Sequence, residues 1–286
     1  MSPEVIQSLT EKWGLNRPIL DQYLSYMVNL VKGDFGISFR SSKPVSQEII
    51  ARLPNTIALI TTAVLIATAL RIVIGIYLAS KRGGKLDTSL TPISVVISCL
   101  PIFWVGMMMI LFFSFRLGLF PPAGTVSPPP NNPTDTVSAI RDYLWHLALP
   151  LSALTLILVG EGLLGIRNLA LDTLSQDYVV TARAKGVKER SVLYKHVFKN
   201  LQLPIVTQLS VSLAQSFGGA IVTETVFGWY GMGRYIFESI ANRDYPALQG
   251  SFFVLTLVVI LANLFADLTY GVLDPRVKAE GSASRQ

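Results

Sequence analysis

Residues that support covalent or metal chemistry are few in this chain and stand far apart. The one cysteine is Cys99, and the two histidines, His146 and His196, belong to no His-Glu-x-x-His pattern. A single thiol excludes an internal disulfide framework and a cysteine-rich zinc site. The sequence also contains no phosphate-binding loop, glycine-rich dinucleotide turn or Gly-x-Ser-x-Gly motif. We therefore predict that the chain has no catalytic residues, binds no metal and holds no cofactor.

A second set of ionisable residues lies inside long apolar segments. A charged side chain at the centre of a membrane helix costs about 2.5 to 3.5 kcal/mol, so it usually faces the bundle interior or a water-filled cavity. We therefore treat Arg71, Glu161 and Glu224 as candidates for a transport pathway or gate. Structural roles stay open beside that hypothesis. Glu161 could instead pair with Arg71 or with a neighbouring subunit, and Glu224 could pack in the aromatic belt at the membrane interface.

The composition indicates a membrane protein. Hydrophobic residues make up 51% of the 286 positions and charged residues 15%, against about 25% charged residues in ordinary soluble domains. A helix needs about 20 mostly apolar residues to cross the hydrocarbon core of a bilayer. Five segments meet that length: 56–79, 93–115, 147–169, 205–227 and 251–272. We predict an all-α polytopic membrane protein with five transmembrane helices in this chain.

Lysine and arginine residues indicate the orientation, because positively charged connections stay on the cytoplasmic side. The connections after the first and third spans and the C-terminal tail together carry thirteen of these residues, against four in the two connections on the opposite side. This asymmetry predicts a multi-pass protein of the inner or plasma membrane with a cytoplasmic C-terminus. Because the positive charge is spread between spans without a basic stripe, we expect no nucleic-acid partner.

Three regions follow from this topology. Residues 1–54 are mixed and polar, and we expect them to form an extracytoplasmic helical segment with turns at Gly14 and Gly33. Residues 55–274 should form the membrane domain, and residues 275–286 a cytoplasmic tail. An extracytoplasmic N-terminal region normally follows a signal peptide or a span. We therefore hypothesise that the natural protein has one more hydrophobic helix upstream.

The cytoplasmic connection at about 172–203 has the pattern of two short amphipathic helices. Asp177 is placed to cap the first helix, and Gly186 supplies a flexible stop after it. One face of this helix carries Tyr178, Val179 and Ala182. One side of the second stretch carries Leu193, Val197 and Leu201, and Leu203-Pro204 ends it. We call the connection at about 172–203 the elbow. Its two short helices suit docking in a groove of another protein, although a merely basic inside loop fits the periodicity as well.

Motifs along nearly the whole chain match one known family. The elbow contains the run Thr181-Ala182-Arg183-Ala184-Lys185-Gly186, with His196 and Asn200 downstream. Flanking motifs include Gly14-Leu15-Asn16-Arg17-Pro18, Gly33-Asp34-Phe35-Gly36, Leu53-Pro54-Asn55-Thr56, Pro101-Ile102-Phe103-Trp104-Val105-Gly106, Glu224-Thr225-Val226-Phe227-Gly228-Trp229, Arg243-Asp244-Tyr245-Pro246 and Leu273-Asp274-Pro275-Arg276-Val277. With these motifs the chain resembles the permease subunits of ATP-binding-cassette (ABC) importers, in the form used by oligopeptide, dipeptide and nickel permeases.

Three positions depart from the general pattern of that family. The elbow has Val180-Thr181-Ala182 where the family has Glu-Ala-Ala, which resembles the peptide-permease subgroup. Tyr230 stands where the family has a proline, and Arg71 stands where it usually has a small residue. The first span of the family precedes the segment where this chain begins, in agreement with the hypothesis of an upstream helix.

The resemblance implies a type I ABC importer transmembrane domain that works with other subunits. A second homologous permease would complete the path, two cytoplasmic ABC ATPases would use ATP and Mg²⁺, and an extracytoplasmic solute-binding protein would deliver the solute. The chain itself would hydrolyse nothing, and its remaining partner would be membrane lipid. The resemblance assigns ATPase coupling to Asp177, Tyr178, Thr181, Ala182, Arg183, Ala184, Lys185 and Gly186.

Two questions stay open in the sequence. The solute is a peptide or a related small solute such as a nickel chelate, because specificity in this family rests largely with the binding protein. The alternative function is an ion-coupled secondary transporter, which would use intramembrane ionisable groups for proton or sodium coupling. The small number of such groups and the absence of a visible inverted repeat favour the ABC importer.

Overall fold

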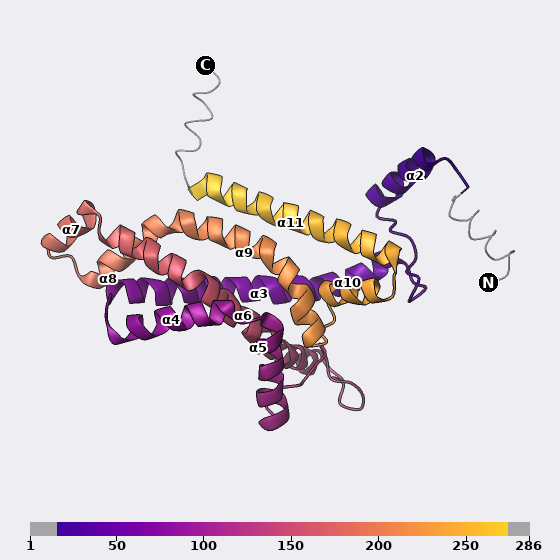
Figure 1. Ribbon diagram of the computed structural model, residues 1–286, viewed down its shortest axis with the longest axis horizontal. Helices are drawn as coiled ribbons and strands as arrows, with labels where there is room; N and C mark the ends of the chain where they lie inside the picture. Colours follow the sequence, from indigo (N-terminus) through magenta and orange to yellow (C-terminus); the bar gives the residue numbers. More distant parts are fainter. Residues whose placement is uncertain (1–15, 274–286) are drawn as a thin grey trace, which may run out of the picture.

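The computed structural model describes residues 16–273, and within that range the chain is built from helices and their connections (Figure 1). The helices are α2 (Ile19–Val31), α3 (Val45–Ser80), α4 (Lys85–Cys99), α5 (Ile102–Met109), η1 (Ile110–Arg116), α6 (Thr136–Leu174), α7 (Asp177–Ala184), α8 (Glu189–Val192), η2 (Leu193–Phe198), α9 (Lys199–Val226), α10 (Met232–Ala241) and α11 (Tyr245–Leu273). The elements η1 and η2 are π-helical. The expected all-α fold is confirmed for the described residues, whereas the predicted turn at Gly14 and the tail 275–286 lie outside them.

Helix length and apolarity confirm the predicted number of spans. Four helical stretches of the described chain are long and apolar enough to cross a membrane: Val45–Ser80, Thr136–Leu174, Glu189–Val226 and Tyr245–Phe265. The pair formed by Lys85–Cys99 and Ile102–Arg116 makes a fifth span when the two parts are counted together. The third stretch joins α8, η2 and α9 into one continuous helix.

The second span is broken near its middle and does not run as one straight helix. Its two parts are bent by 102° at the break after Cys99, and α5 projects away from the bundle in Figure 1. Leu100 adopts an extended conformation and Pro101 caps α5. The cause is steric, because the ring of a proline drives the preceding residue out of the helical region.

Two helices continue through prolines that stand at expected boundaries. Helix α3 begins at Val45 and runs through Pro54, so the boundary expected between residues 54 and 55 falls inside a helix. Likewise, Pro204 does not begin the fourth span but lies inside α9. A proline removes one helical hydrogen bond, but in membrane helices neighbouring groups compensate for it. The turn expected at Gly33 is confirmed by its φ of +79°.

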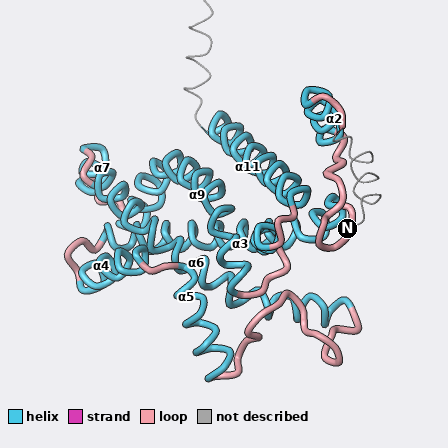
Figure 2. Tube along the Cα trace, turned by 45° about the vertical axis from the view of Figure 1, so that its right-hand side comes forward, coloured by secondary structure: helices cyan, strands magenta, loops and turns pink. Residues whose placement is uncertain are grey.

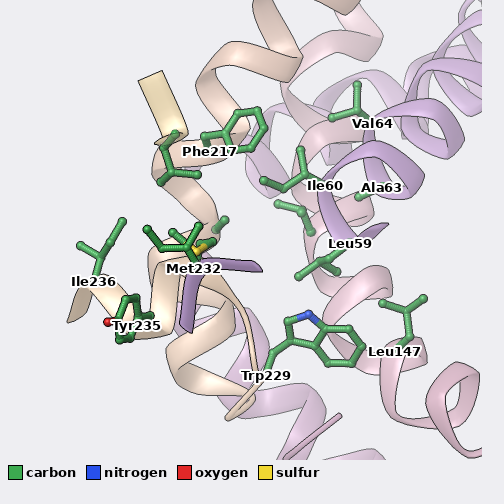
Figure 3. Close-up of a cluster of buried hydrophobic side chains, with 14 of the residues drawn as sticks. Leu59, Ile60, Ala63, Val64, Leu147, Phe217, Trp229, Met232, Tyr235 and Ile236 are labelled. Carbon is green, nitrogen blue, oxygen red and sulfur yellow. The ribbon is translucent and has the colours of Figure 1, made fainter. Parts of the chain in front are cut away.

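The main core lies where α3 packs along α6 and where α9 and α10 close over both. Trp229 is fully buried, and Figure 3 shows it beside Leu59 and Leu147. Its indole nitrogen donates a hydrogen bond to the carbonyl oxygen of Asn55 at 3.2 Å. The ring of Tyr143 lies 5.2 Å from it, centroid to centroid. The bulky indole therefore joins the loop before α10 to both central helices.

The bundle has two differently built ends (Figures 1 and 2). At one end, a second apolar cluster joins the last turn of α3 to α6, α7, α8 and η2, and contains Ala79, Val179 and Val192. At the other end, the loop before α6 lies against α9, where the N–H of Gly124 donates to the carbonyl oxygen of Phe227 at 2.9 Å. Figure 1 shows the elbow at one end of the bundle and the segment before α3 at the other.

Candidate functional site

The helix of the elbow, α7, starts one residue earlier than the sequence predicts. Asp177 is its first helical residue, whereas Gln176 occupies the cap position and its side chain makes no capping hydrogen bond. The prediction that Asp177 caps the helix is therefore wrong. Its carboxylate still lies in the first turn, where the positive end of the helix dipole favours a negative charge.

Two faces of α7 have different surroundings. Val179 is fully buried and Ala182 is buried, so this side packs against the bundle. The exposed face carries Asp177, Val180, Thr181 and Ala184, and we call this set the docking face. Tyr178 was expected to share the face of Val179 and Ala182, but it is 44% exposed and its hydroxyl accepts a hydrogen bond from the Asn200 amide at 2.7 Å. Sequence reasoning missed Val180, although its spacing from Asp177 and Ala184 follows the helix period.

Gly186 ends α7 as the sequence predicts. Its φ is +78°, a left-handed conformation that favours glycine. The N–H of Gly186 donates to the carbonyl oxygen of Arg183 at 2.9 Å, and the N–H of Val187 donates to that of Ala182 at 3.2 Å. These bonds satisfy carbonyl groups at the end of the helix and turn the chain towards α8. Lys185 is exposed beside this turn.

An ion pair closes the elbow on its outer surface. The guanidinium of Arg183 donates to both carboxylate oxygens of Glu189, at 2.6 and 3.1 Å. Hydrogen bonding to Glu189 raises the pKa of Arg183 above its ordinary value. The two side chains are 41% and 50% exposed, so water screens much of their attraction.

We expect Arg183→Ala to lower the free energy of unfolding by less than about 1 kcal/mol, because exposed ion pairs contribute little. Val179→Ala should cost more, since it leaves a cavity at a fully buried position. Thermal unfolding of the two purified variants compares these losses. A larger loss for Arg183→Ala than for Val179→Ala would mean that the ion pair, and not the apolar face, holds the elbow.

Arg71 is buried inside the bundle and therefore does not line an open path. Its Nε donates to the carbonyl oxygen of Leu158 at 2.7 Å, and its Nη2 donates to the same oxygen. Its Nη1 lies 3.4 Å from the hydroxyl oxygen of Ser212. Gly162 leaves room for it, since a Cβ there would come within 2.5 Å of the guanidinium carbon. Arg71 thus bridges α3, α6 and α9 in the single chain, and a pathway role in the assembled permease stays a prediction.

Glu161 has the opposite surroundings. Its side chain is exposed on α6, and no ion pair within the described residues joins it to Arg71. The two residues therefore form no contact ion pair within the described chain, although their charges are close enough to interact. An exposed carboxylate in the middle of a span has to face water or a second subunit rather than lipid. Glu161 remains a pathway candidate.

Glu224 is fully buried at the end of α9 and so does not line an open path either. Its carboxylate accepts hydrogen bonds from the hydroxyl of Thr56 at 2.6 Å and from the N–H of Arg234 at 3.1 Å. The Thr56 oxygen in turn accepts from the N–H of Met232 at 2.7 Å. A Cβ at Gly231 would overlap the carboxylate. Glu224 thus ties α3, α9 and the first turn of α10 together, and the gate assignment stays a prediction.

A second polar link at this end was missed by sequence reasoning. The hydroxyl of Ser38 donates to the carboxylate of Asp244 at 2.5 Å, and Arg40 pairs with Glu238. Burial works against the charged form of Asp244, but the bonds from Ser38 and from backbone N–H groups keep the pKa of its carboxyl below the ordinary value. The loop after α2 is thereby attached to α10. The partners lie about two hundred residues apart, and the only local signal was the motif containing Asp244.

The assembled features are an α-helical membrane bundle with an exposed helical elbow at one end. Residues 71–279 match the family described as "Binding-protein-dependent transport system inner membrane component". The chain belongs to this family. The resemblance to importer permeases read from the motifs is thereby confirmed, and the family offers no support for an ion-coupled transporter.

Relatives of this inner membrane component match it over nearly its full length. The oligopeptide transport system permease protein AppB of Bacillus subtilis (strain 168) is 36% identical over 97% of this chain and 88% of its own. The dipeptide transport system permease protein DppB of Escherichia coli (strain K12) is 35% identical over 97% and 86%. The DppB protein of Alkalihalophilus pseudofirmus is 39% identical over 97% and 87%.

Solved structures show the same fold for this inner membrane component. A chain of the MetNI methionine ABC transporter, in an inward facing conformation, superposes with a TM-score of 0.64 at 15% identity. The match covers 79% of this chain and 95% of that one. A chain of an amino acid ABC transporter gives a TM-score of 0.53 at 17% identity, over 79% and 94%. The expected type I importer fold is therefore confirmed.

Proposed function

We propose that this permease subunit carries short peptides across the membrane as part of an ABC importer. The observation that carries the proposal is the similarity over 97% of the chain to permease proteins named for oligopeptide and dipeptide transport. The subunit works with a second homologous permease, two cytoplasmic ABC ATPases and an extracytoplasmic solute-binding protein. ATP and Mg²⁺ act in the ATPases, and this chain serves as the path and not as the enzyme.

The docking face of α7 is the contact that we assign to an ATPase, together with the neighbouring Tyr178, Arg183, Lys185 and Gly186. Its outer side exposes small and apolar groups, Val180 and Ala184, which suit insertion into a groove. Its inner side is fixed to the bundle through Val179. A push on the elbow therefore moves the apolar cluster behind it and not a flexible loop.

The helix behind the elbow carries that push across the membrane. The stretch Glu189–Val226 is continuous and has a length of about 57 Å at 1.5 Å per residue. Val192, Val197 and Leu201 belong to the same apolar cluster as Val179. At its far end, Glu224 holds α10. Closure of the ATPase pair would thus tilt the stretch Glu189–Val226, which we call the lever, as one rigid helix. This tilt would rotate the spans between inward-open and outward-open states.

The orientation follows from the two ends of the bundle. The elbow and the basic connection between α3 and α4 share one end, which we place in the cytoplasm. Helix α11 runs from the end that holds α10 towards the end that holds the elbow (Figure 1). We therefore infer a cytoplasmic C-terminus and an extracytoplasmic position for the segment before α3.

Reconstitution tests the proposal. We expect proteoliposomes that contain the complete complex to take up a labelled dipeptide or oligopeptide only with binding protein outside and ATP inside. Collapsing the proton and sodium gradients should leave the initial rate unchanged within about twofold, because ATP closure drives the cycle. Uptake of a nickel chelate instead of a peptide would refute the substrate class. Gradient-driven uptake by this chain without ATPases would refute the ABC mechanism.

A further inference from the structure

An apolar groove lies between α3 and the segment that follows the elbow. It encloses about 880 Å³, and the side chains that form its wall include Ile72, Val73 and Ile76 of α3 and Phe198 of η2. Val73 is 68% exposed, so the described part of the chain leaves this wall largely uncovered. From Ala69 to Ile76 the groove follows α3 for about 10 Å along the helix axis.

The polar residues of the groove all come from its cytoplasmic side. They are Lys188, Arg190, Ser191 and Lys195, next to the elbow. No ion pair among the described residues uses any of the three cations, since the nearby carboxylate of Glu189 is taken by Arg183. The groove thus combines an apolar wall with unpaired positive charge at one end.

An aromatic pair lies at the same level as these cations. Tyr194 is 71% exposed, and its ring stacks on that of Phe198 at 5.9 Å with an interplanar angle of 18°. Tyrosine is enriched where membrane helices meet the headgroup region, because its ring is apolar and its hydroxyl is polar. This position fits the orientation inferred above, in which α3 ends at the cytoplasmic surface.

We propose that this groove is a binding site for an anionic phospholipid of the cytoplasmic leaflet. An acyl chain would lie along Ile72, Val73 and Ile76, and the phosphate would lie between the cations and the hydroxyl of Ser191. A zwitterionic lipid would gain less, because its headgroup has no net charge to balance three cations. The site joins α3 to the base of the elbow, so a bound lipid would brace the lever.

Native mass spectrometry of the full chain, purified in mild detergent with the subunits that accompany it, tests the proposal. With phosphatidylglycerol and phosphatidylcholine added in equal amounts, the wild type should retain phosphatidylglycerol preferentially. Combined Lys188→Ala, Arg190→Ala and Lys195→Ala should weaken its apparent affinity at least about tenfold, since each cation near a lipid surface is worth roughly fivefold. The matched control is Arg82→Ala, Lys85→Ala and Lys199→Ala, which removes three cations outside the groove and should change affinity less than about twofold.

A second variant keeps the charge and fills the groove. Ala69→Phe should also weaken retention of phosphatidylglycerol, and it decides the question alone if the triple variant does not assemble. Equal retention of the two lipids, equal loss in both triple variants or normal retention by Ala69→Phe would overturn the proposal. Efficient cross-linking of Val73→Cys to a second permease subunit, in a Cys99→Ser background, would also overturn it by showing that protein covers the groove.

Discussion

Replacing Val180 and Ala184 together by aspartate is expected to abolish ATP-driven transport while the chain stays folded in the membrane. Both side chains point away from the bundle on α7, so the change adds no charge to the core. In the proposed complex they enter a groove of the ATPase, where a carboxylate without a partner costs several kcal/mol. We expect the affinity for the ATPase to fall at least about hundredfold, equivalent to about 2.8 kcal/mol.

The measurement is binding of the ATPase subunit to the immobilised permease, followed by uptake into proteoliposomes. The matched control is Thr88→Asp with Asn168→Asp, which adds the same charge at exposed positions outside the docking face. Val179→Asp serves as the opposite control, because it buries a charge in the apolar cluster and should disrupt the elbow itself. Wild-type binding by the Val180 and Ala184 double variant would show that the elbow does not contact the motor.

Glu224→Ala is expected to lower the free energy of unfolding by roughly 2 to 4 kcal/mol, since it leaves the Thr56 hydroxyl and the Arg234 N–H buried without an acceptor. It also leaves a void between α3, α9 and α10 that the surrounding side chains fill only in part. Glu224→Gln retains one oxygen acceptor but turns N–H groups towards donors. The loss of unfolding free energy in Glu224→Gln should therefore be smaller than that in Glu224→Ala but larger than zero.

Thermal unfolding in detergent ranks these variants against Glu161→Ala. Glu161 is exposed and joins no ion pair among the described residues, so its removal should leave stability nearly unchanged. A Glu224→Ala protein that unfolds like the wild type but transports nothing would support the gate hypothesis instead of the structural role. A marked loss of stability in Glu161→Ala would place that side chain in a packed interior after all.

The span count and the elbow could be predicted from sequence because both depend on local patterns. Hydropathy over about 20 residues locates a membrane helix wherever its partners lie. The left-handed turn at Gly186 and the burial of Val179 likewise follow from residue type and helix period. Local patterns did not predict whether a proline interrupts a helix. The helix is interrupted before Pro101, whereas Pro54 lies inside α3. The difference depends on packing around each helix.

The roles of the intramembrane charges were decided by the tertiary structure alone. Arg71, Glu161 and Glu224 look alike in sequence, since each is a charge in an apolar segment. In the fold, Arg71 reaches a backbone carbonyl of α6, Glu224 holds the start of α10, and Glu161 is exposed without a contact ion pair among the described residues. Hydropathy determines that a segment enters the membrane, but the partner of a buried charge depends on helices brought together from distant parts of the chain.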